Sequence, residues 1–175
     1  SNLQGCYMLL DEASVTGTAN IIMAAVMAKG TTTIYNAACE PHVQDLCNFL
    51  VKCGAKISGI GSNRLIIEGV AELGKAGDVI EWSILSDHID IAGLIVGAAV
   101  TNGEILIKNA IPYHMTQILN YFAKINLKVE VRGEDLFVPK DQDLFCKSNF
   151  KGDLDKIPDQ PWPGFPVDLI PQAII

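Results

Sequence analysis

One pattern of apolar and polar positions occurs twice along the chain. Residues 19–37 form an apolar run rich in alanine, then a glycine, then a β-branched stretch, and residues 91–110 follow the same order. The two glycines, Gly30 and Gly103, lie 73 residues apart, and an asparagine follows each of them six residues later. A repeat of this length indicates that each copy is one supersecondary unit, so we expect function to lie between units.

The first copy predicts a helix, a strand, a second helix and two further strands. Hydroxyl side chains at 14–18 are suited to cap the first helix, and Gly30 is suited to end it. Pro41 begins the second helix, because proline is tolerated in a first turn. Its apolar residues have helical spacing: Val43, Leu46, Cys47, Leu50 and Val51. The predicted ranges are 19–28, 31–36, 41–53, 55–58 and 64–68.

The second copy predicts the same elements. Asp87 caps a helix that ends near Asn102, and residues 104–108 form a strand. Pro112 begins an amphipathic helix with the apolar stripe Met115, Ile118, Leu119 and Phe122. Two strands, 127–131 and 135–138, close the copy.

The first helix of each copy is apolar nearly all round, whereas the second is amphipathic. A helix that is apolar on every side is normally buried on every side. We therefore expect these first helices to lie in the middle of the fold with sheets outside them. This is the reverse of most α/β proteins, in which helices cover the sheet.

The segments outside the two copies differ in character. Residues 79–84 predict a strand that leads into the second copy, and the polar, proline-rich stretch 147–165 predicts an exposed loop. Residues 167–175 turn apolar again, and the chain stops within that run. We therefore expect the chain to be a truncated piece of a longer protein.

Composition excludes several classes of function. The net charge of −7 and the absence of a basic stripe argue against nucleic-acid binding. No apolar run is long enough to span a bilayer, and no signal peptide is visible. The five cysteines have no regular spacing and the three histidines are far apart, so we expect no metal site and a reducing, cytoplasmic setting.

Residues 14–70 closely resemble the enolpyruvyl transferase family. The motifs that carry the resemblance are a Lys-Gly-Thr-Thr-Thr-Ile-Tyr-Asn-Ala run at 29–37, a Gly-Ala-Lys-Ile-Ser-Gly run at 54–59, an Arg-Leu-Ile-Ile-Glu-Gly-Val run at 64–70 and a Phe-Pro-Val-Asp element at 165–168. The resemblance is dense in the first copy, weaker through the second and strong again near Asp168.

The resemblance implies a fold and a domain arrangement. Family members have two lobes, each an inside-out barrel of three α/β repeats of βαβαββ type, with helices inside and sheets outside. On this basis residues 3–83 are the last repeat of the first lobe. Residues 84–175 are then the first repeat of the second lobe together with the truncated start of the next.

The resemblance also implies a reaction and site residues. The family reaction adds a sugar 3-hydroxyl to C2 of phosphoenolpyruvate and then expels phosphate. Asp168 matches the family carboxylate that accepts the hydroxyl proton and contacts the sugar nucleotide, although it also suits a helix cap. Ser14, Val15 and Thr16 match the segment that binds the UDP part of UDP-N-acetylglucosamine, and a plain helix cap is the alternative there.

Other family residues are expected outside this chain. These are a proton-donating cysteine, a lysine and several arginines, so we expect the chain alone to be inactive. Cys39 is interpreted as a structural cysteine and not as that thiol. His88 replaces a family arginine, and we assign it no function.

Two alternatives remain open. One is the sister enzyme of the shikimate pathway, and the other is a non-catalytic α/β repeat module that binds a partner through exposed apolar surface. The preferred hypothesis implies UDP-N-acetylglucosamine and phosphoenolpyruvate as substrates, no metal or organic cofactor, no nucleic acid and no membrane. Lost lobe contacts would expose apolar surface through which the chain can self-associate.

Overall fold

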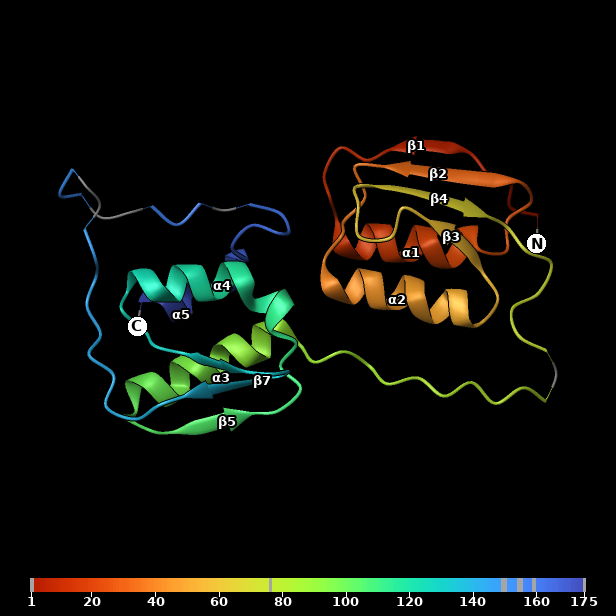
Figure 1. The fold of residues 1–175 in the computed structure, drawn as a ribbon. Coiled ribbons are helices and arrows are strands. Elements are labelled where there is room, and N and C mark those ends of the chain that lie inside the picture. Colours follow the sequence, from red (N-terminus) through yellow and green to blue (C-terminus); the bar gives the residue numbers. More distant parts are fainter. Residues whose placement is uncertain (1, 76, 149–150, 154–155, 159, 175) are drawn as a thin grey trace. The chain divides into compact units, whose positions relative to one another are not determined.

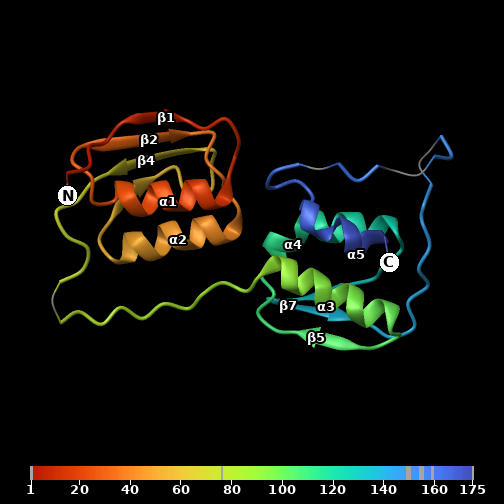
Figure 2. The same cartoon turned by 180° about the vertical axis from the view of Figure 1, so that it is seen from behind.

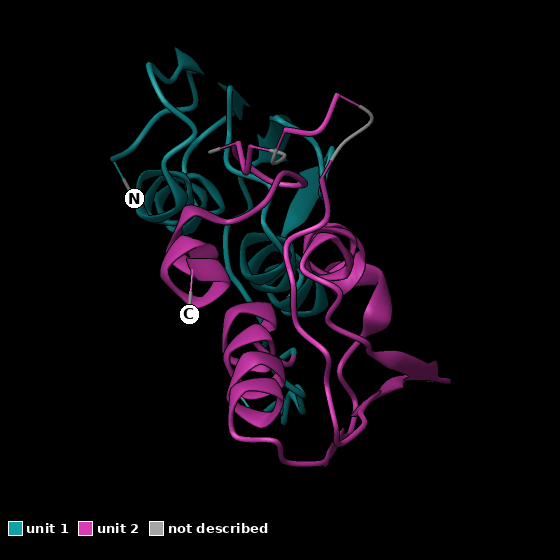
Figure 3. Cartoon of the chain, turned by 90° about the vertical axis from the view of Figure 1, so that its left-hand side faces the viewer, with its two compact units in different colours: residues 1–85 teal, residues 86–175 magenta. Residues whose placement is uncertain are grey.

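The structure is a computed structural model that describes residues 2–75, 77–148, 151–153, 156–158 and 160–174. It divides into two compact units, Ser1–Leu85 and Ser86–Ile175, drawn in different colours in Figure 3. The assignment of residues 3–83 and 84–175 to repeats of two different lobes stays a prediction.

Unit 1 is a sheet covered on one face by two helices (Figures 1 and 2). Strand order is β1-β2-β4-β3, with β1 parallel to β2 and the other neighbouring pairs antiparallel. The elements are β1 (Tyr7–Leu9), α1 (Val15–Ala25), β2 (Thr31–Tyr35), α2 (Pro41–Lys52), β3 (Lys56–Ser58) and β4 (Arg64–Glu68). The order αβαββ predicted for residues 14–68 is therefore confirmed.

The core of unit 1 forms where the alternating strands meet the helix stripes. In β2, Thr32 and Ile34 point inward, while Thr31 and Tyr35 are exposed. This alternation is typical of a sheet with one buried face. The predicted stripe of α2 is buried at Val43, Cys47 and Leu50, half-buried at Leu46 and 41% exposed at Val51.

Unit 2 repeats this architecture with three strands in the order β5-β7-β6, all antiparallel. Its core includes Ile95, Met115, Phe122 and Leu136, all of them fully buried or nearly so. The elements are α3 (His88–Val100), β5 (Ile105–Ile107), α4 (Pro112–Lys124), β6 (Glu130–Arg132), β7 (Asp135–Val138), the 3₁₀ helix η1 (Val167–Leu169) and α5 (Ile170–Ile174).

The sequence repeat is also a repeat of the backbone. Order β2-β4-β3 in unit 1 matches β5-β7-β6 in unit 2. Asn36 and Asn109, which occupy matching positions, both have left-handed backbones with φ of 61° and 51°. Ser14 and Asp87, also 73 residues apart, cap the first helix of their respective units. The mixed α/β class is confirmed.

Two details of the predicted strands are wrong. Residues 79–84 form no strand, and Val79 and Ile84 at its ends are 88% and 85% exposed, because no neighbouring strand pairs with this segment. Strand β1 of unit 1 consequently has no counterpart among the described residues of unit 2. The strand predicted from residue 127 begins only at Glu130, where β6 starts to pair with β7. Leu127 lies before this pairing and is buried in the core.

The apolar first helices are not buried on every side in this chain. Helix α1 buries Ile22 and Ala25 but leaves Met23 50% exposed. Helix α3 buries Ile91 and Ile95 but leaves Leu94 49% exposed. The physical reason is that the neighbouring elements cover only part of each helix surface: the sheet and α2 for α1, and the sheet, α4, η1 and α5 for α3.

Candidate functional site

The first candidate segment, Ser14 to Thr16, lies at the N-terminus of α1. Ser14 has an extended backbone (φ −70°, ψ 123°), and its Oγ accepts a hydrogen bond from the Gly17 amide at 3.1 Å. Val15 is half-buried and begins the helix, while Thr16 is exposed. The predicted helix cap is therefore confirmed, and the remaining amides of the first turn face the start of the helix without intrahelical acceptors.

The electrostatics of this helix end differ from those of its counterpart in unit 2. Helix α1 has no acidic residue in its first turn. Helix α3 has Asp87 as its cap, with Oδ1 accepting from the Ile89 amide at 2.8 Å, and Asp90 in its first turn. Carboxylates at a helix N-terminus offset its partial positive charge. No carboxylate within the first turn of α1 offsets this charge, so on that count its start is the better of the two ends for an anionic group.

The second candidate, Asp168, is the middle residue of η1 in unit 2. Its side chain is exposed, while Leu169 beside it is fully buried. The Leu169 amide donates to the Pro166 carbonyl at 3.0 Å, which closes this single turn. The turn packs against α3. Asp168 therefore presents a solvent-accessible carboxylate from a backbone that is tied to the core.

Phe165 fixes the chain just before Asp168. Its ring is fully buried. The centroid of this ring lies 5.0 Å from that of Tyr121 and 6.4 Å from that of Phe122, and both residues are on α4. Gly164 precedes it in a tight turn, in which an added Cβ would lie 2.4 Å from Cβ of Gln160. A side chain at 164 would therefore shift the loop that carries the carboxylate.

The predicted site residues thus form two groups. Ser14, Val15 and Thr16 lie together in unit 1, and Asp168 lies in unit 2. The rings of His88 and Trp162 meet in unit 2 with a centroid distance of 5.5 Å, and the sequence pattern predicts no role for either residue. No periodic signal links two residues so far apart in the chain, and only the departure of His88 from a family arginine marked the position.

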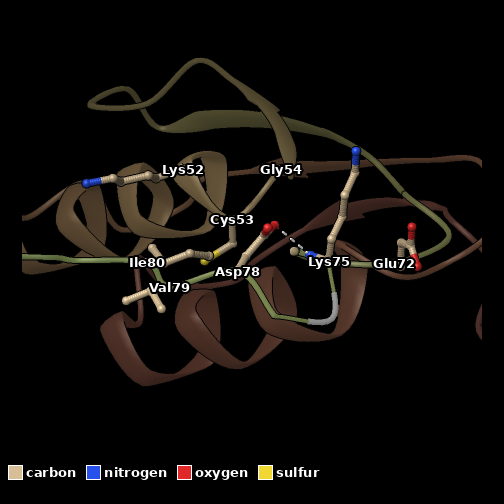
Figure 4. A pocket seen from close by; sticks show the side chains of 9 residues that line it. Lys52, Cys53, Gly54, Glu72, Lys75, Asp78, Val79 and Ile80 are labelled. Carbon is tan, nitrogen blue, oxygen red and sulfur yellow. Dashed lines mark hydrogen bonds between the residues drawn. The ribbon is translucent and has the colours of Figure 1, made fainter.

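A hollow of about 510 Å³ lies on unit 1 away from these candidates (Figure 4). Lys52 and Lys75 lie on its border, but their ammonium groups extend in different directions. Asp78 accepts a hydrogen bond from the Lys75 amide at 2.9 Å. A binding site for a charged ligand needs polar groups that converge, and these do not.

Burial makes Cys39 and Cys47 poor candidates for a reactive thiol, and no metal centre is found in the described part of the chain. Burial, with a smaller contribution from the Glu40 carboxylate, raises the pKa of Cys39, and burial raises the pKa of Cys47 to about 11. These shifts disfavour the nucleophilic thiolate. Over residues 2–174, gaps excepted, no group of three or more His, Cys, Asp or Glu side chains is placed to hold a metal ion.

Comparison with known proteins defines the class. A family model described as EPSP synthase (3-phosphoshikimate 1-carboxyvinyltransferase) matches residues 1–174. The chain therefore belongs to the EPSP synthase family of enolpyruvyl transferases. Solved structures agree in fold: the enolpyruvyl transferase NikO from Streptomyces tendae (TM-score 0.69, 16% identity) and EPSP synthase from Acinetobacter baumannii (TM-score 0.57, 19% identity) each cover 79% of the chain. The chain covers 35% of the first and 32% of the second.

Curated relatives are much more similar in sequence. UDP-N-acetylglucosamine 1-carboxyvinyltransferase of Bacteroides thetaiotaomicron is 50% identical over 99% of this chain. The enzyme of the same name from Borreliella burgdorferi is 48% identical over the whole chain. The chain spans about two fifths of the length of these relatives, 39% and 40% respectively.

No helix among the described residues has both the length and the apolar character required to cross a membrane.

Proposed function

We propose that the chain is part of an enzyme that transfers the enolpyruvyl group of phosphoenolpyruvate to the 3-hydroxyl of UDP-N-acetylglucosamine and releases phosphate. This reaction belongs to peptidoglycan precursor synthesis, and we place the enzyme in the bacterial cytoplasm. The observation that carries the proposal is 50% identity over 99% of the chain to a relative named for this reaction. The longer enzyme is called the parent below.

The shikimate-pathway reaction is the second candidate. The family model carries its name, and EPSP synthase of Acinetobacter baumannii shares the fold. Sequence identity to that structure is 19%, against 50% to the UDP-N-acetylglucosamine relative. The identity therefore supports a sugar nucleotide as the acceptor.

Asp168 is the proposed general base. A sugar hydroxyl is a poor nucleophile until a carboxylate within hydrogen-bond reach takes its proton as the new bond forms. Asp168 has the accessibility for this role, and the buried Phe165 and Leu169 on either side hold its backbone. The same residue contacts the sugar nucleotide in this proposal.

Ser14, Val15 and Thr16 are the proposed binding segment for the UDP diphosphate. The N-terminus of α1 supplies free amides and a partial positive charge that no acidic side chain of its first turn offsets. The exposed Thr16 hydroxyl is accessible to a ligand. The Ser14 hydroxyl is already used as the cap, so this residue acts mainly by holding the helix end.

The chain alone lacks part of what the reaction requires. A phosphoenolpyruvate site concentrates several Arg or Lys side chains around its anionic groups. This chain is acidic overall, with 13 Lys and Arg against 20 Asp and Glu. In the proposal these cations, and the acid that protonates the substrate, come from the rest of the parent. We expect the 175 residues alone to be inactive, and phosphate release by them would refute this.

The test is the substitution Asp168→Asn in the intact parent. The amide cannot accept the hydroxyl proton, so we expect kcat for phosphate release to fall by about 10² to 10⁴. The matched control is Asp143→Asn, which neutralises another exposed carboxylate of unit 2. Full activity of Asp168→Asn, or an equal loss in Asp143→Asn, would contradict the proposed base.

A further inference from the structure

Trp162 lies between two histidines of unit 2. Its ring meets the His88 ring with a centroid distance of 5.5 Å and an interplanar angle of 72°. It meets the His114 ring at 6.1 Å and 81°. Both are edge-to-face contacts, which aromatic rings prefer over stacked sandwiches. The three rings form what is called the Trp162 clamp below.

The clamp attaches the loop that contains Trp162 to two helices. His88 is buried, at 4% exposed, and begins α3, while His114 lies in the first turn of α4. The loop that contains Trp162 is therefore held at the N-terminal ends of α3 and α4. Phe165, three residues further on, packs against Tyr121 and Phe122 of α4.

A short segment joins these contacts to Asp168. The segment 162–169 has only one turn of 3₁₀ helix to stiffen it. On its C-terminal side the buried Leu169 fixes the backbone. On its N-terminal side the fixed points are the Phe165 ring and the Trp162 ring.

We propose that Trp162 is a positioning residue: its ring, held edge-on by His88 and His114, fixes the N-terminal end of segment 162–169 and thereby the Asp168 carboxylate. The inference rests on the proposed role of Asp168 in the reaction. It extends that role to residues that contact no substrate in the proposal. It also gives His88 a function of its own, which is to pack against the ring.

The first experiment measures backbone order in the 175-residue chain by amide hydrogen exchange. We expect Trp162→Leu, which removes the ring, to raise exchange at least about tenfold at the Leu169 amide, which is hydrogen-bonded to the Pro166 carbonyl. Trp162→Phe keeps an aromatic edge and should stay near the wild-type rate. Trp82→Leu is the matched control, because Trp82 packs on Phe49 in unit 1. Exchange at Ile95 and Leu136 reports whether unit 2 remains folded.

The second experiment measures kinetics in the intact parent. A misplaced base slows the chemical step, so Trp162→Leu should lower kcat by about 10- to 100-fold and leave KM for phosphoenolpyruvate within about twofold. Trp162→Phe should restore most of kcat, and Trp82→Leu should not change it. A general loss of folding would instead lower the active fraction in both Trp162 variants.

The outcomes separate the inference from the proposed function. Unchanged exchange at the Leu169 amide in Trp162→Leu, or equal loss of kcat in Trp162→Leu and Trp162→Phe, would overturn the inference alone. Full activity of Asp168→Asn would overturn the proposed function, whatever the exchange result. Raised exchange, lowered kcat and rescue by Trp162→Phe together would support the positioning role.

Discussion

Asp168 and Ser14 acquire their proposed roles from different local causes. Asp168 is exposed because it lies between inward-facing anchors, Phe165 and Leu169. Ser14 holds the start of α1 because its hydroxyl binds the Gly17 amide. Asp168 is thus placed by the burial of its neighbours, and Ser14 is placed by its own hydrogen bond. Substitutions at the two sites should therefore differ in their effect on stability.

Replacing Ser14 by alanine removes the cap of α1. We expect Ser14→Ala to lower the free energy of unfolding of unit 1 by about 1 kcal/mol. It should also weaken binding of UDP-N-acetylglucosamine to the parent, measured by titration calorimetry. Asp87→Ala removes the matching cap of unit 2 and should leave that affinity unchanged. Equal affinities for wild type and Ser14→Ala would count against the helix end as a binding segment.

His114 should give unit 2 a dependence on pH. Burial lowers the pKa of the His114 imidazole from its usual 6.5. The unfolded chain then binds the proton more readily than the folded one, so stability present above pH 6.5 falls as the pH drops through the lowered pKa. Histidine NMR titration should show this lowered pKa, and Trp162→Leu should raise it by uncovering the ring. An unshifted pKa in the wild type would contradict the burial.

At the scale of elements, matched turns precede the second helix of each unit. Asn36 and Asn109 have φ of 61° and 51°, a region in which alanine is strained and glycine is not. The two sites differ in their contacts: Asn36 Nδ2 donates to the Leu10 carbonyl at 2.9 Å, whereas the Asn109 backbone amide donates to Asp135 Oδ1 at 2.9 Å. The repeat therefore conserves the backbone at this turn and not all of its side-chain contacts.

This difference predicts different responses to glycine. Asn109→Ala should destabilise unit 2 by about 1 kcal/mol, and Asn109→Gly should be close to neutral. Asn36→Gly should cost about 1 kcal/mol because it also removes the bond to Leu10. Urea unfolding of each variant measures these differences. A penalty for Asn109→Gly as large as that for Asn109→Ala would show that φ is not the cause.

The sequence predicted the elements well where a periodic pattern and a turn residue agree. The stripe of α2, the strand β2 and the caps Ser14 and Asp87 are examples. It failed at residues 79–84, because β-branched composition alone cannot supply a strand with a neighbour. It also missed the Trp162 clamp, because the contact joins a loop to two helix ends that are distant in sequence.

At the scale of the whole molecule, the exposed apolar faces of α1 and α3 are the main departure from the predicted fold. Met23 on α1 and Leu94 on α3 are about half exposed, although both helices have the composition of buried elements. In the inside-out barrel expected from the family resemblance, other repeats of the parent cover these faces. The 175-residue chain should then associate with itself through them.

Sedimentation velocity measures this association. The combined variant Met23→Glu and Leu94→Glu should shift the chain toward the monomer, because charge on the contact faces opposes their burial. Val79→Glu adds a carboxylate at a position 88% exposed and outside both helices, and should change nothing. Association that survives the double substitution, or persists unchanged in the parent, would exclude these faces as the contact.

The central claim is the identity of the acceptor, and phosphate release by the intact parent tests it most directly. The parent is incubated with phosphoenolpyruvate and either UDP-N-acetylglucosamine or shikimate 3-phosphate, and the initial rates are compared. We predict release with the sugar nucleotide, loss of that release in Asp168→Asn, and no release with shikimate 3-phosphate. Release with shikimate 3-phosphate alone would contradict the account.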